Sequence, residues 1–404
     1  MVRRTQFVTV FPLCIPVSSL DCCAGEDRMI RVYQFILDHR IGGPHVYVDT
    51  LRKALVGKVE SIIVTTSRGP MTDIALLNLR HLWTPLYALE IILNAIYLVG
   101  AVLLRRVERR GVVFNVHGGA NLAPILAARI VGIPVVWHFH ETTPQFRQLV
   151  SIGMLLLRGH PHSLVVVANK AKEAYRLRNA EFIPAAIDES FWSLAQVSAE
   201  EVELCGWGGD EDTEVRGRSS RILVVGNLNP LKGIDLLLEA IEKVDSTIWD
   251  VKIVGAELKT HREYAGRLYL RASEVIASKN KCAIDFLGWQ DARKIRALLA
   301  SCDVFILPSR SEACPIVLLE AIAMRCRCIV TNVGDVSEML QGAVGSELIT
   351  PDSSEALTIA LNKMFLTEPL LVKNEGWLRN CYSVSKFSTS TYAIYEKNAG
   401  AWIR

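Results

Sequence analysis

The sequence lacks the patterns that mark several special classes of protein. No internal repeat and no tract of low complexity is visible in its 404 residues, which argues against solenoids and disordered chains. Its ten cysteines show no C-x-x-C spacing, so we expect buried thiols in a reducing cytosol rather than disulfides or a zinc site. No stripe of basic and aromatic residues indicates a nucleic-acid partner. These absences leave an ordinary globular protein that is long enough for two domains.

Charge is present but is unevenly spread along the chain. Residues 29–180 contain 18 Lys and Arg against 8 Asp and Glu, a net charge of +10, whereas residues 181–404 contain 24 against 31, or −7. A basic N-terminal half suits an anionic surface or substrate, although a solvated basic face would give the same count.

Two apolar segments could be mistaken for membrane signals. Residues 1–28 have a basic start and an apolar middle, but prolines interrupt them, and we interpret them as an N-terminal extension that need not be ordered. Residues 82–104 are long enough to cross a bilayer. Because Glu90 would be costly near mid-span, we expect a buried crossover helix rather than a transmembrane one. A helix lying on a membrane surface is the open alternative.

From Met29 onwards, short apolar runs alternate with segments of helical periodicity, a pattern typical of α/β domains with parallel sheets. The expected strands are 32–37, 61–66, 112–117, 134–139, 163–169, 182–188, 221–227, 249–255, 282–288, 302–308 and 327–332. We divide the chain into an N-terminal extension (1–28), a Rossmann-like domain (29–195), an acidic, glycine-rich linker region (196–219), a second Rossmann-like domain (220–384) and a C-terminal segment (385–404). Such sheets bind ligands beyond the carboxyl ends of their strands, so we expect the site in the cleft between the domains.

Two glycine-containing turns open expected helices. Gly42 and Gly43 would let the backbone turn sharply and approach a phosphate, although a plain strand-to-helix turn explains them equally well. The segment NPLKG places Lys232 at the start of a helix in the second domain. A lysine there opposes the helix dipole unless an anion lies between them, but an exposed lysine in a polar loop is an alternative explanation.

The stretch PSRSEACPIVLLEA (308–321) carries sharper information. Pro315 suits the first turn of a helix, which puts Glu312 at the mouth of that helix and Glu320 on its second turn, between two apolar residues. A buried carboxylate needs a partner, because desolvating a charge is costly. Vicinal hydroxyls of a sugar or a ribose can supply one by donating two hydrogen bonds to the same carboxylate.

With these residues the chain resembles the retaining glycosyltransferases of family 4, whose GT-B fold has two doubly wound Rossmann-like domains facing a central cleft. The resemblance runs through VVGNLNPLKG, CDVFILPSRSEACPIVLLEAIAM and TNVGDVSEML in the second half and through GIPVVWHFHET in the first. It implies an acceptor-side N-terminal domain and a sugar-nucleotide-binding C-terminal domain. It also implies a C-terminal helix, within 385–404, that packs back on the N-terminal domain.

The resemblance implies a role for each candidate residue. Glu312 would hold hydroxyls of the transferred sugar, Glu320 would bind the ribose hydroxyls, and Lys232 would neutralise the donor diphosphate. His117 would reach the donor sugar or the acceptor, and His140 is a weaker candidate on the acceptor side; each could equally be a satisfied strand-end residue. The remaining donor contacts would come from the backbone of Gly42, Gly43, Ala313 and Cys314.

The sequence also departs from the family pattern. Asn227, a candidate donor-binding residue, stands where the family usually has an arginine as a second phosphate cation, which puts full charge neutralisation in doubt. Arg325 stands where glycine is common, and a left-handed backbone there would cost about 1 kcal/mol. No metal site is expected in this fold, and we interpret the acidic run 210–212 as solvated charge of the linker region.

The resemblance implies a hexosyltransferase-like enzyme. It would transfer a sugar, with retention, from a nucleotide-diphosphate sugar to a glycan or lipid-linked acceptor in cell-surface polysaccharide or glycolipid biosynthesis. We expect no cofactor apart from this co-substrate, and no nucleic acid. We expect a cytoplasmic location, at the inner face of the membrane if the basic half binds anionic lipid. A sugar-nucleotide epimerase of the same fold and a non-catalytic nucleotide-sugar-binding protein are the alternatives.

Overall fold

The computed structural model describes most of the chain. The described residues are 29–37, 42–66, 71–78, 85–104, 111–193, 197–207, 220–244, 249–279, 282–341, 343, 345–366 and 375–401. The predicted N-terminal extension and the acidic run 210–212 lie outside them.

The first sheet is parallel, with the strand order β3-β2-β1-β4-β5-β6-β7. Its strands are β1 (Ile30–Ile36), β2 (Val59–Thr65), β3 (Ile74–Ala75), β4 (Val112–His117), β5 (Val135–Phe139), β6 (His162–Val166) and β7 (Glu181–Phe182). The chain starts at β1 inside the sheet, adds strands on one side and then on the other, and so is doubly wound. In this register His117 lies beside Ile36 of β1 and beside His138 of β5.

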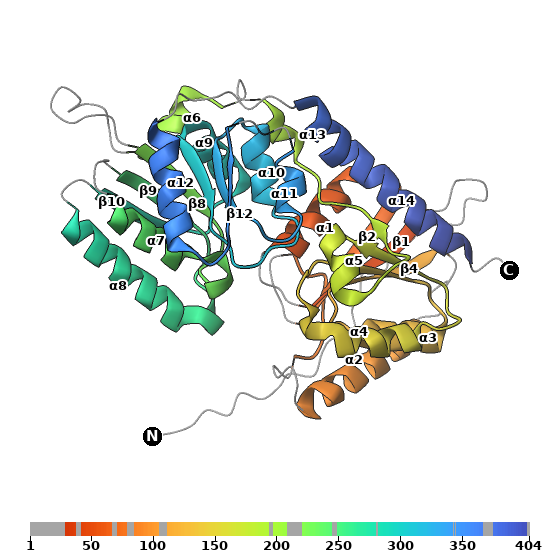
Figure 1. The fold of residues 1–404 in the computed structure, drawn as a ribbon. Helices are drawn as coiled ribbons and strands as arrows, with labels where there is room; N and C mark the ends of the chain where they lie inside the picture. Colours follow the sequence, from red (N-terminus) through yellow and green to blue (C-terminus); the bar gives the residue numbers. More distant parts are fainter. Residues whose placement is uncertain are drawn as a thin grey trace.

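The second sheet is also parallel, with the order β10-β9-β8-β11-β12-β13. Its strands are β8 (Ser220–Val225), β9 (Trp249–Val254), β10 (Cys282–Gly288), β11 (Val304–Leu307), β12 (Cys328–Thr331) and β13 (Glu347–Ile349). The predicted fold class is therefore confirmed: the molecule contains two parallel-sheet α/β domains (Figure 1).

Helices cover both faces of each sheet (Figure 1). They are α1 (Gly43–Ala54), α2 (Pro85–Leu104), α3 (Ala123–Val131), α4 (Arg147–Leu156), α5 (Asn169–Tyr175), α6 (Ala199–Glu203), α7 (Ile234–Lys243), α8 (Arg262–Ser278), α9 (Ala292–Ser301), α10 (Ile316–Ala323), α11 (Val336–Met339), α12 (Ser354–Leu366), α13 (Glu375–Tyr382) and α14 (Val384–Gly400), with short 3-10 turns η1 (Pro144–Phe146), η2 (Glu189–Trp192), η5 (Pro230–Lys232) and η6 (Lys259–His261). In the first domain α2 to α5 bury one face of the sheet, and α1 and α14 bury the other. In the second domain α9, α10, α11 and α13 cover one face and α7, α8 and α12 the other.

Two expected elements differ in extent from the prediction. Of the strand expected over 182–188, only its first residue lies in β7; Ile187 makes a single bridge to Ser383. Pro184 breaks the run, because proline cannot donate to a strand ladder. Part of the expected linker region is also ordered: α6 has a capping box formed by Ser198 and Glu201. Just after α6, Trp207 is buried in the core of the second domain.

The C-terminal helix α14 lies against the first domain, as the blue helix beside the red and orange segments in Figure 1 shows. Its Tyr395 hydroxyl accepts hydrogen bonds from the amide nitrogens of Gln34 (3.2 Å) and Asn115 (2.7 Å). Further along the helix, the Asn398 amide donates to Ser163 Oγ at 2.9 Å. The last helix therefore completes one face of the first sheet.

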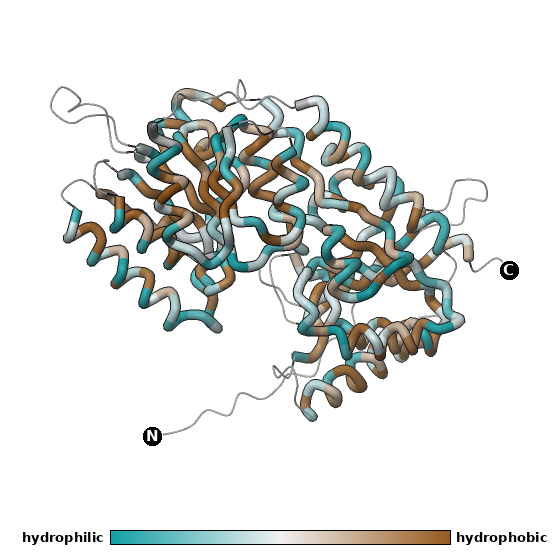
Figure 2. Tube along the Cα trace, in the orientation of Figure 1, coloured by the Kyte–Doolittle hydropathy of each residue, from teal (hydrophilic) through white to brown (hydrophobic). Residues whose placement is uncertain are grey.

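Helix α2 is not the fully buried crossover helix that the sequence suggested. Glu90 and Asn94, the polar residues near the middle of its predicted span, face the domain, where Asn94 exchanges two hydrogen bonds of 2.9 Å with the backbone of Leu77. The outer residues are apolar and exposed: Leu86, Leu89, Ile92, Leu93, Ile96, Tyr97, Leu103 and Leu104. Figure 2 shows brown segments along this helix. Among the described residues it is the one helix long and apolar enough to cross a membrane, and one third of its most apolar window is buried.

Candidate active site

The turn after β11 is held by hydrogen bonds and by a glycine. Thr331 Oγ1, at the end of β12, donates to Ser309 O at 2.5 Å. The Arg310 N–H donates to Leu231 O, in the loop before α7, at 2.8 Å. Gly334 has a φ of 56°, and a Cβ at that position would lie 2.3 Å from Glu312 O. Only glycine therefore lets the loop after β12 approach the turn so closely.

Glu312 and Lys232 form an ion pair across the site. Lys232 Nζ lies 2.6 Å from Glu312 Oε1, and the side chains are 25% and 11% exposed. Ser309 Oγ donates to the same oxygen at 2.8 Å, whereas Oε2 accepts no hydrogen bond from the described part of the protein. The anion predicted to lie near Lys232 is thus, in the absence of ligand, a carboxylate of the protein itself.

The loop before α7 carries Lys232 in the 3-10 turn η5. Asn229 caps this turn, since its side chain accepts the Leu231 N–H at 3.0 Å. Gly233 then adopts a φ of 63°, where a Cβ would lie 2.0 Å from Pro308 O. The two loops can therefore meet only if this residue is glycine, and that contact brings Lys232 to Glu312.

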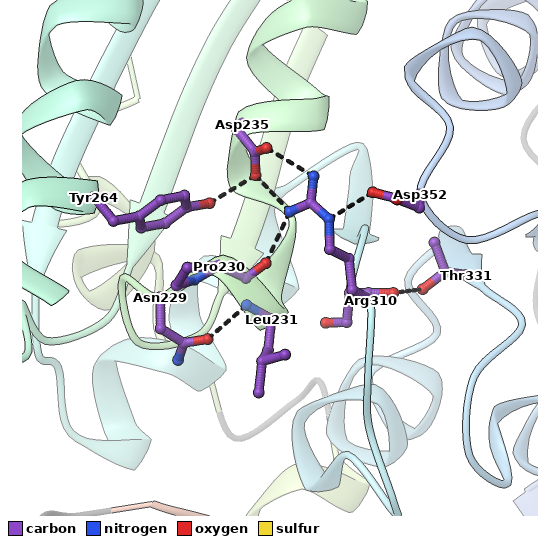
Figure 3. Close-up of polar contacts among 9 residues, drawn as sticks. Asn229, Pro230, Leu231, Asp235, Tyr264, Arg310, Thr331 and Asp352 are labelled. Carbon is purple, nitrogen blue, oxygen red and sulfur yellow. Dashed lines mark hydrogen bonds and ion pairs between the residues drawn. The ribbon is translucent and has the colours of Figure 1, made fainter. Parts of the chain in front are cut away.

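Arg310 joins the two loops and was missed by the sequence analysis. Its guanidinium donates to both Asp235 oxygens (2.9 and 2.8 Å), to Asp352 Oδ1 (2.6 Å) and to Pro230 O (2.8 Å), and Tyr264 donates to Asp235 at 2.7 Å (Figure 3). Burial alone would raise the pKa of Asp235, but the hydrogen bonds from Arg310 and Tyr264 hold it below its usual value. The sequence could have suggested that Arg310 pairs with a carboxylate. It could not have predicted that the partner is Asp235, in the first turn of α7, because the chain has many acidic residues.

Glu320 lies on the second turn of α10, as the sequence predicted. Its carboxylate makes no hydrogen bond or ion pair with the described residues. Burial, and then the negative charge of Asp188, raises the pKa of Glu320 to about 8. A carboxyl group in this state is ready to be stabilised by donors that a ligand supplies.

The segment between the two glutamates differs in one detail from the expectation. Pro315 is the N-cap of α10, with a ψ of 105°, rather than a residue of its first turn. Ala313 O accepts the Asp335 N–H at 3.1 Å. Burial raises the pKa of the Cys314 thiol to about 12, so this cysteine is a neutral thiol at pH 7.

Contacts between the domains meet at the same turn. Thr142 Oγ1, two residues beyond His140, donates to Glu312 O at 2.8 Å. Asp335, at the start of α11, accepts hydrogen bonds from the backbone N–H groups of Asn169 and Lys170 at the N-terminus of α5. The loop after β5 therefore lies directly against the glutamate turn, and sequence spacing gave no sign of either contact.

The two predicted histidines lie together, at different depths. His117 is 2% exposed, and its Nδ1 lies 2.9 Å from His140 Nε2. His140 is less buried and belongs to the segment that reaches Glu312 through Thr142. His140 is thus two residues from a direct contact with the Glu312 turn, whereas His117 is buried at the end of β4.

The structure describes the backbone of Gly42 and Gly43 and the amide of Asn227. Gly42 is extended, with a φ of −163°, and Gly43 does not adopt a positive φ, as in the plain strand-to-helix turn that the sequence left open as an alternative. A Cβ at Gly43 would meet no atom of the described residues within 4 Å. The Asn227 Oδ1 accepts the Ala256 N–H at 3.0 Å, so this oxygen joins the ends of β8 and β9.

Comparisons with known proteins relate the second domain to a known family. Residues 219–366 match the family model described as "Glycosyl transferases group 1". The chain is 31% identical over 170 residues to the putative teichuronic acid biosynthesis glycosyltransferase TuaC of Bacillus subtilis, covering 40% of this chain and 39% of TuaC. It is 23% identical to the alpha-D-kanosaminyltransferase of Streptomyces kanamyceticus over 72% of this chain and 80% of that protein.

The fold extends the likeness to the whole chain. The crystal structure of Anabaena HepE in complex with UDP and glucose superposes with a TM-score of 0.71 at 14% identity, covering 91% of this chain and 100% of HepE. The chain spans well under half of the length of TuaC, so the activity of that relative is not carried over with the match. The molecule as a whole has the GT-B fold, and its residues 219–366, which hold Lys232, Glu312 and Glu320, match the glycosyl transferases of group 1.

Proposed function

We propose that the protein transfers a sugar from a nucleotide-diphosphate sugar to an acceptor hydroxyl, with retention of the anomeric configuration. One observation carries the proposal: the turn after β11 brings a lysine-paired carboxylate, Glu312, next to a helix whose half-buried carboxylate, Glu320, has no protein partner among the described residues. The glycosyltransferase relatives and the UDP complex of HepE support it.

Donor binding, on this proposal, is an exchange of ion-pair partners. The ribose hydroxyls donate to Glu320, and the diphosphate takes the Lys232 ammonium from Glu312. Glu312 is then free to accept hydrogen bonds from hydroxyls of the sugar. Backbone N–H groups of Ala313, Cys314 and the Gly42–Gly43 loop complete the phosphate site.

The same residues stabilise the charges of transfer. Cleavage of the sugar–phosphate bond builds negative charge on the leaving diphosphate, which Lys232 and the nearby helix N-terminus stabilise. The acceptor attacks from the face of the leaving group, and a donor phosphate oxygen takes its proton. The hydrogen bond from Thr142 to Glu312 O joins the first domain to this turn, and on this proposal closure of the two domains around the donor would limit access of water. We propose that no metal ion or other cofactor takes part, so that transfer continues in EDTA.

A donor screen tests the binding step. The purified protein is heated with UDP-, GDP-, ADP- or dTDP-sugars, and a donor at 100 times its Kd should add about 2.7 kcal/mol to the free energy of unfolding. The isosteric variant Glu320→Gln should lose most of this gain, whereas Glu347→Gln, which alters a surface carboxylate paired with Lys363, should keep it. Equal shifts in wild type and Glu320→Gln would remove the role of Glu320.

Product analysis separates the three functions that share a bound donor. Glycosyl transfer gives a new glycoside of the same anomeric configuration, and an epimerase gives a changed sugar with no transfer. A non-catalytic binding protein consumes no donor. A product of inverted configuration would contradict the retaining mechanism.

We propose a cytoplasmic enzyme whose acceptor, a glycan or a lipid-linked glycan, is met at an anionic membrane surface. The exposed apolar face of α2 and the +10 charge of residues 29–180 both suit such a surface. Sedimentation with phosphatidylserine vesicles should retain the protein, and Ile96→Ser should weaken binding several-fold. Ile359→Ser is the matched control, since both isoleucines are 62% exposed but Ile359 lies on α12 of the other domain. Equal binding by both variants would move the contact away from α2.

A further inference from the structure

Three histidines form a cluster under the loops of the first domain. His117 ends β4, His138 lies beside it on β5, and His140 follows two residues later. Ring nitrogens of all three lie within 4.8 Å of one another, and the closest pair, His117 Nδ1 and His140 Nε2, is 2.9 Å apart. The Tyr47 ring packs edge-on against all three imidazoles.

His138 has no evident reason to be polar. It is fully buried, and neither of its ring nitrogens has a hydrogen-bond partner among the described residues. Val136, two residues earlier on the same face of β5, lies in the apolar core. A buried imidazole without a partner is costly, so a valine or leucine would be expected at this position unless a ligand uses the nitrogen.

Two groups lie near Nε2 of His117: Gln34 Oε1 at 3.0 Å, which can only accept, and Asn115 Nδ2 at 3.2 Å, which can only donate. The two protons of Asn115 Nδ2 have shorter contacts, of 2.7 Å each, with Gln34 Oε1 and the Tyr395 hydroxyl. We therefore assign the His117 proton to Nε2, which donates to Gln34, and the lone pair to Nδ1. Gln34 is held in place by Asn115 and Tyr395. A histidine whose second nitrogen donates to a carbonyl oxygen is arranged as metal-bound histidines are.

We propose that His117, His138 and His140 bind one divalent transition-metal ion of the Zn²⁺ type. Imidazole nitrogen suits Zn²⁺, Co²⁺, Ni²⁺ and Cu²⁺, whereas Mg²⁺ and Ca²⁺ prefer oxygen. Tetrahedral ligands at about 2.05 Å from Zn²⁺ lie about 3.4 Å apart, so small rotations of the rings close the present cluster around an ion. The proton on His140 Nε2 moves to Nδ1, and a water molecule completes the coordination on the less buried side of His140.

One consequence rests on the proposed function. His117 and His140 are the histidines assigned to the sugar or acceptor, and an ion that holds them removes both from that role. The metal is therefore an inhibitor of transfer rather than a cofactor, and transfer should continue in EDTA.

Binding itself can be tested without an activity assay. EDTA-treated, dialysed protein is titrated with Co²⁺, and visible d–d absorption of a four-coordinate site should appear and saturate at one ion per chain. Zn²⁺ should abolish the absorption. His138→Gln should weaken binding by at least 100-fold, and Gln34→Leu by about tenfold to 100-fold through the loss of the second hydrogen bond of His117.

His160→Gln is the matched control. His160 is also buried in the first domain, but its Nε2 is bonded to Ile133 O at 2.8 Å outside the cluster. This variant should bind Co²⁺ as wild type does. Circular dichroism shows whether each variant folds; if His138→Gln does not, Gln34→Leu and His140→Gln carry the test. Absence of saturable Co²⁺ binding in wild type, or unchanged binding in the folded cluster variants, overturns the proposal.

A transfer assay then tests inhibition separately. Saturating Zn²⁺ should reduce the rate at least tenfold in wild type and should leave His138→Gln unaffected. Metal binding without inhibition would contradict the inhibitory role but not the metal site. If the protein had no transferase activity, the proposed function would fail, and the Co²⁺ spectrum would still test the metal site.

Discussion

The two domains build their polar sites in opposite ways. The second domain places charged groups at the tips of its loops, where Lys232 pairs with Glu312 and Arg310 pairs with Asp235 at or near the surface. The first domain buries neutral groups beneath its loops, where Gln34, Asn115 and His117 share hydrogen bonds inside the sheet. A charged site can exchange its partners for those of a ligand, whereas the neutral buried network holds His117 in one orientation and tautomer.

Removing the charge of Lys232 should have the largest effect on the rate of transfer and would show whether the charged site of the second domain is catalytic. Lys232→Met is expected to lower kcat/KM by about 100- to 1000-fold, because the diphosphate loses a cation placed at its developing charge. Steady-state assays with the donor found in the screen measure it. Lys243→Met is the control, since Lys243 pairs with Glu239 at the other end of α7. Similar losses in both variants would contradict the assignment.

Glu320 should make donor binding depend on pH in a way that the first domain does not. Its pKa of about 8 means that most molecules carry a neutral carboxyl group at pH 6, and the ribose hydroxyls need the carboxylate. Donor affinity should therefore rise about tenfold per pH unit from pH 6 and level off above pH 8. Calorimetric titrations at four pH values measure this, and Glu320→Gln should give a flat profile.

The raised pKa of Glu320 also determines whether its contribution to the stability of the folded state rises or falls with pH. Because the pKa of Glu320 in the folded state lies above its ordinary value of 4.5, the folded state binds the extra proton. The contribution of Glu320 to stability is full below pH 4.5 and is lost as the pH rises through 8. Between pH 4.5 and pH 9, the free energy of unfolding of Glu320→Gln should fall less than that of wild type. If the two free energies changed in parallel with pH, the raised pKa of Glu320 would be contradicted.

Arg310 tests whether positioning alone matters in the charged site. Arg310→Lys keeps the charge but loses the two-pronged bond to Asp235, so the loop carrying Lys232 is less well held. We expect kcat/KM to fall about tenfold, a loss of about 1.4 kcal/mol. Arg271→Lys is the control, because Arg271 also bridges two carboxylates, Glu242 and Glu274, away from the site.

Changing Tyr395, in the neutral network of the first domain, should have the smallest effect on catalysis. Tyr395→Phe deprives Gln34 of an acceptor inside the first domain, which should lower the free energy of unfolding by about 1–3 kcal/mol. Activity of the folded variant should change only a few-fold. Urea denaturation measures the stability, and Tyr392→Phe on the same helix should stay within about 0.5 kcal/mol of wild type.

The sequence by itself determined the elements and the charged site. Alternating apolar runs predicted both parallel sheets, and the 308–321 stretch placed Glu312 and Glu320 correctly, because strand, turn and helix are neighbours in the chain and obey local rules. Arg325 adopts the left-handed backbone (φ 60°) considered for it from the sequence. Gly42 and Gly43 form the plain strand-to-helix turn that the sequence left open, because an extended start of α1 does not require glycine.

Tertiary structure alone decided the contacts between distant segments. Arg310 found Asp235 and Asp352, Tyr395 closed a network more than 300 residues away in sequence from Gln34, and three histidines converged beneath Tyr47. Helix α2 turned its polar residues inward and left apolar ones outside, against the expectation of burial. The physical reason is the same in each case: hydropathy and propensity act over a few residues, whereas partners are chosen by how whole sheets and helices pack.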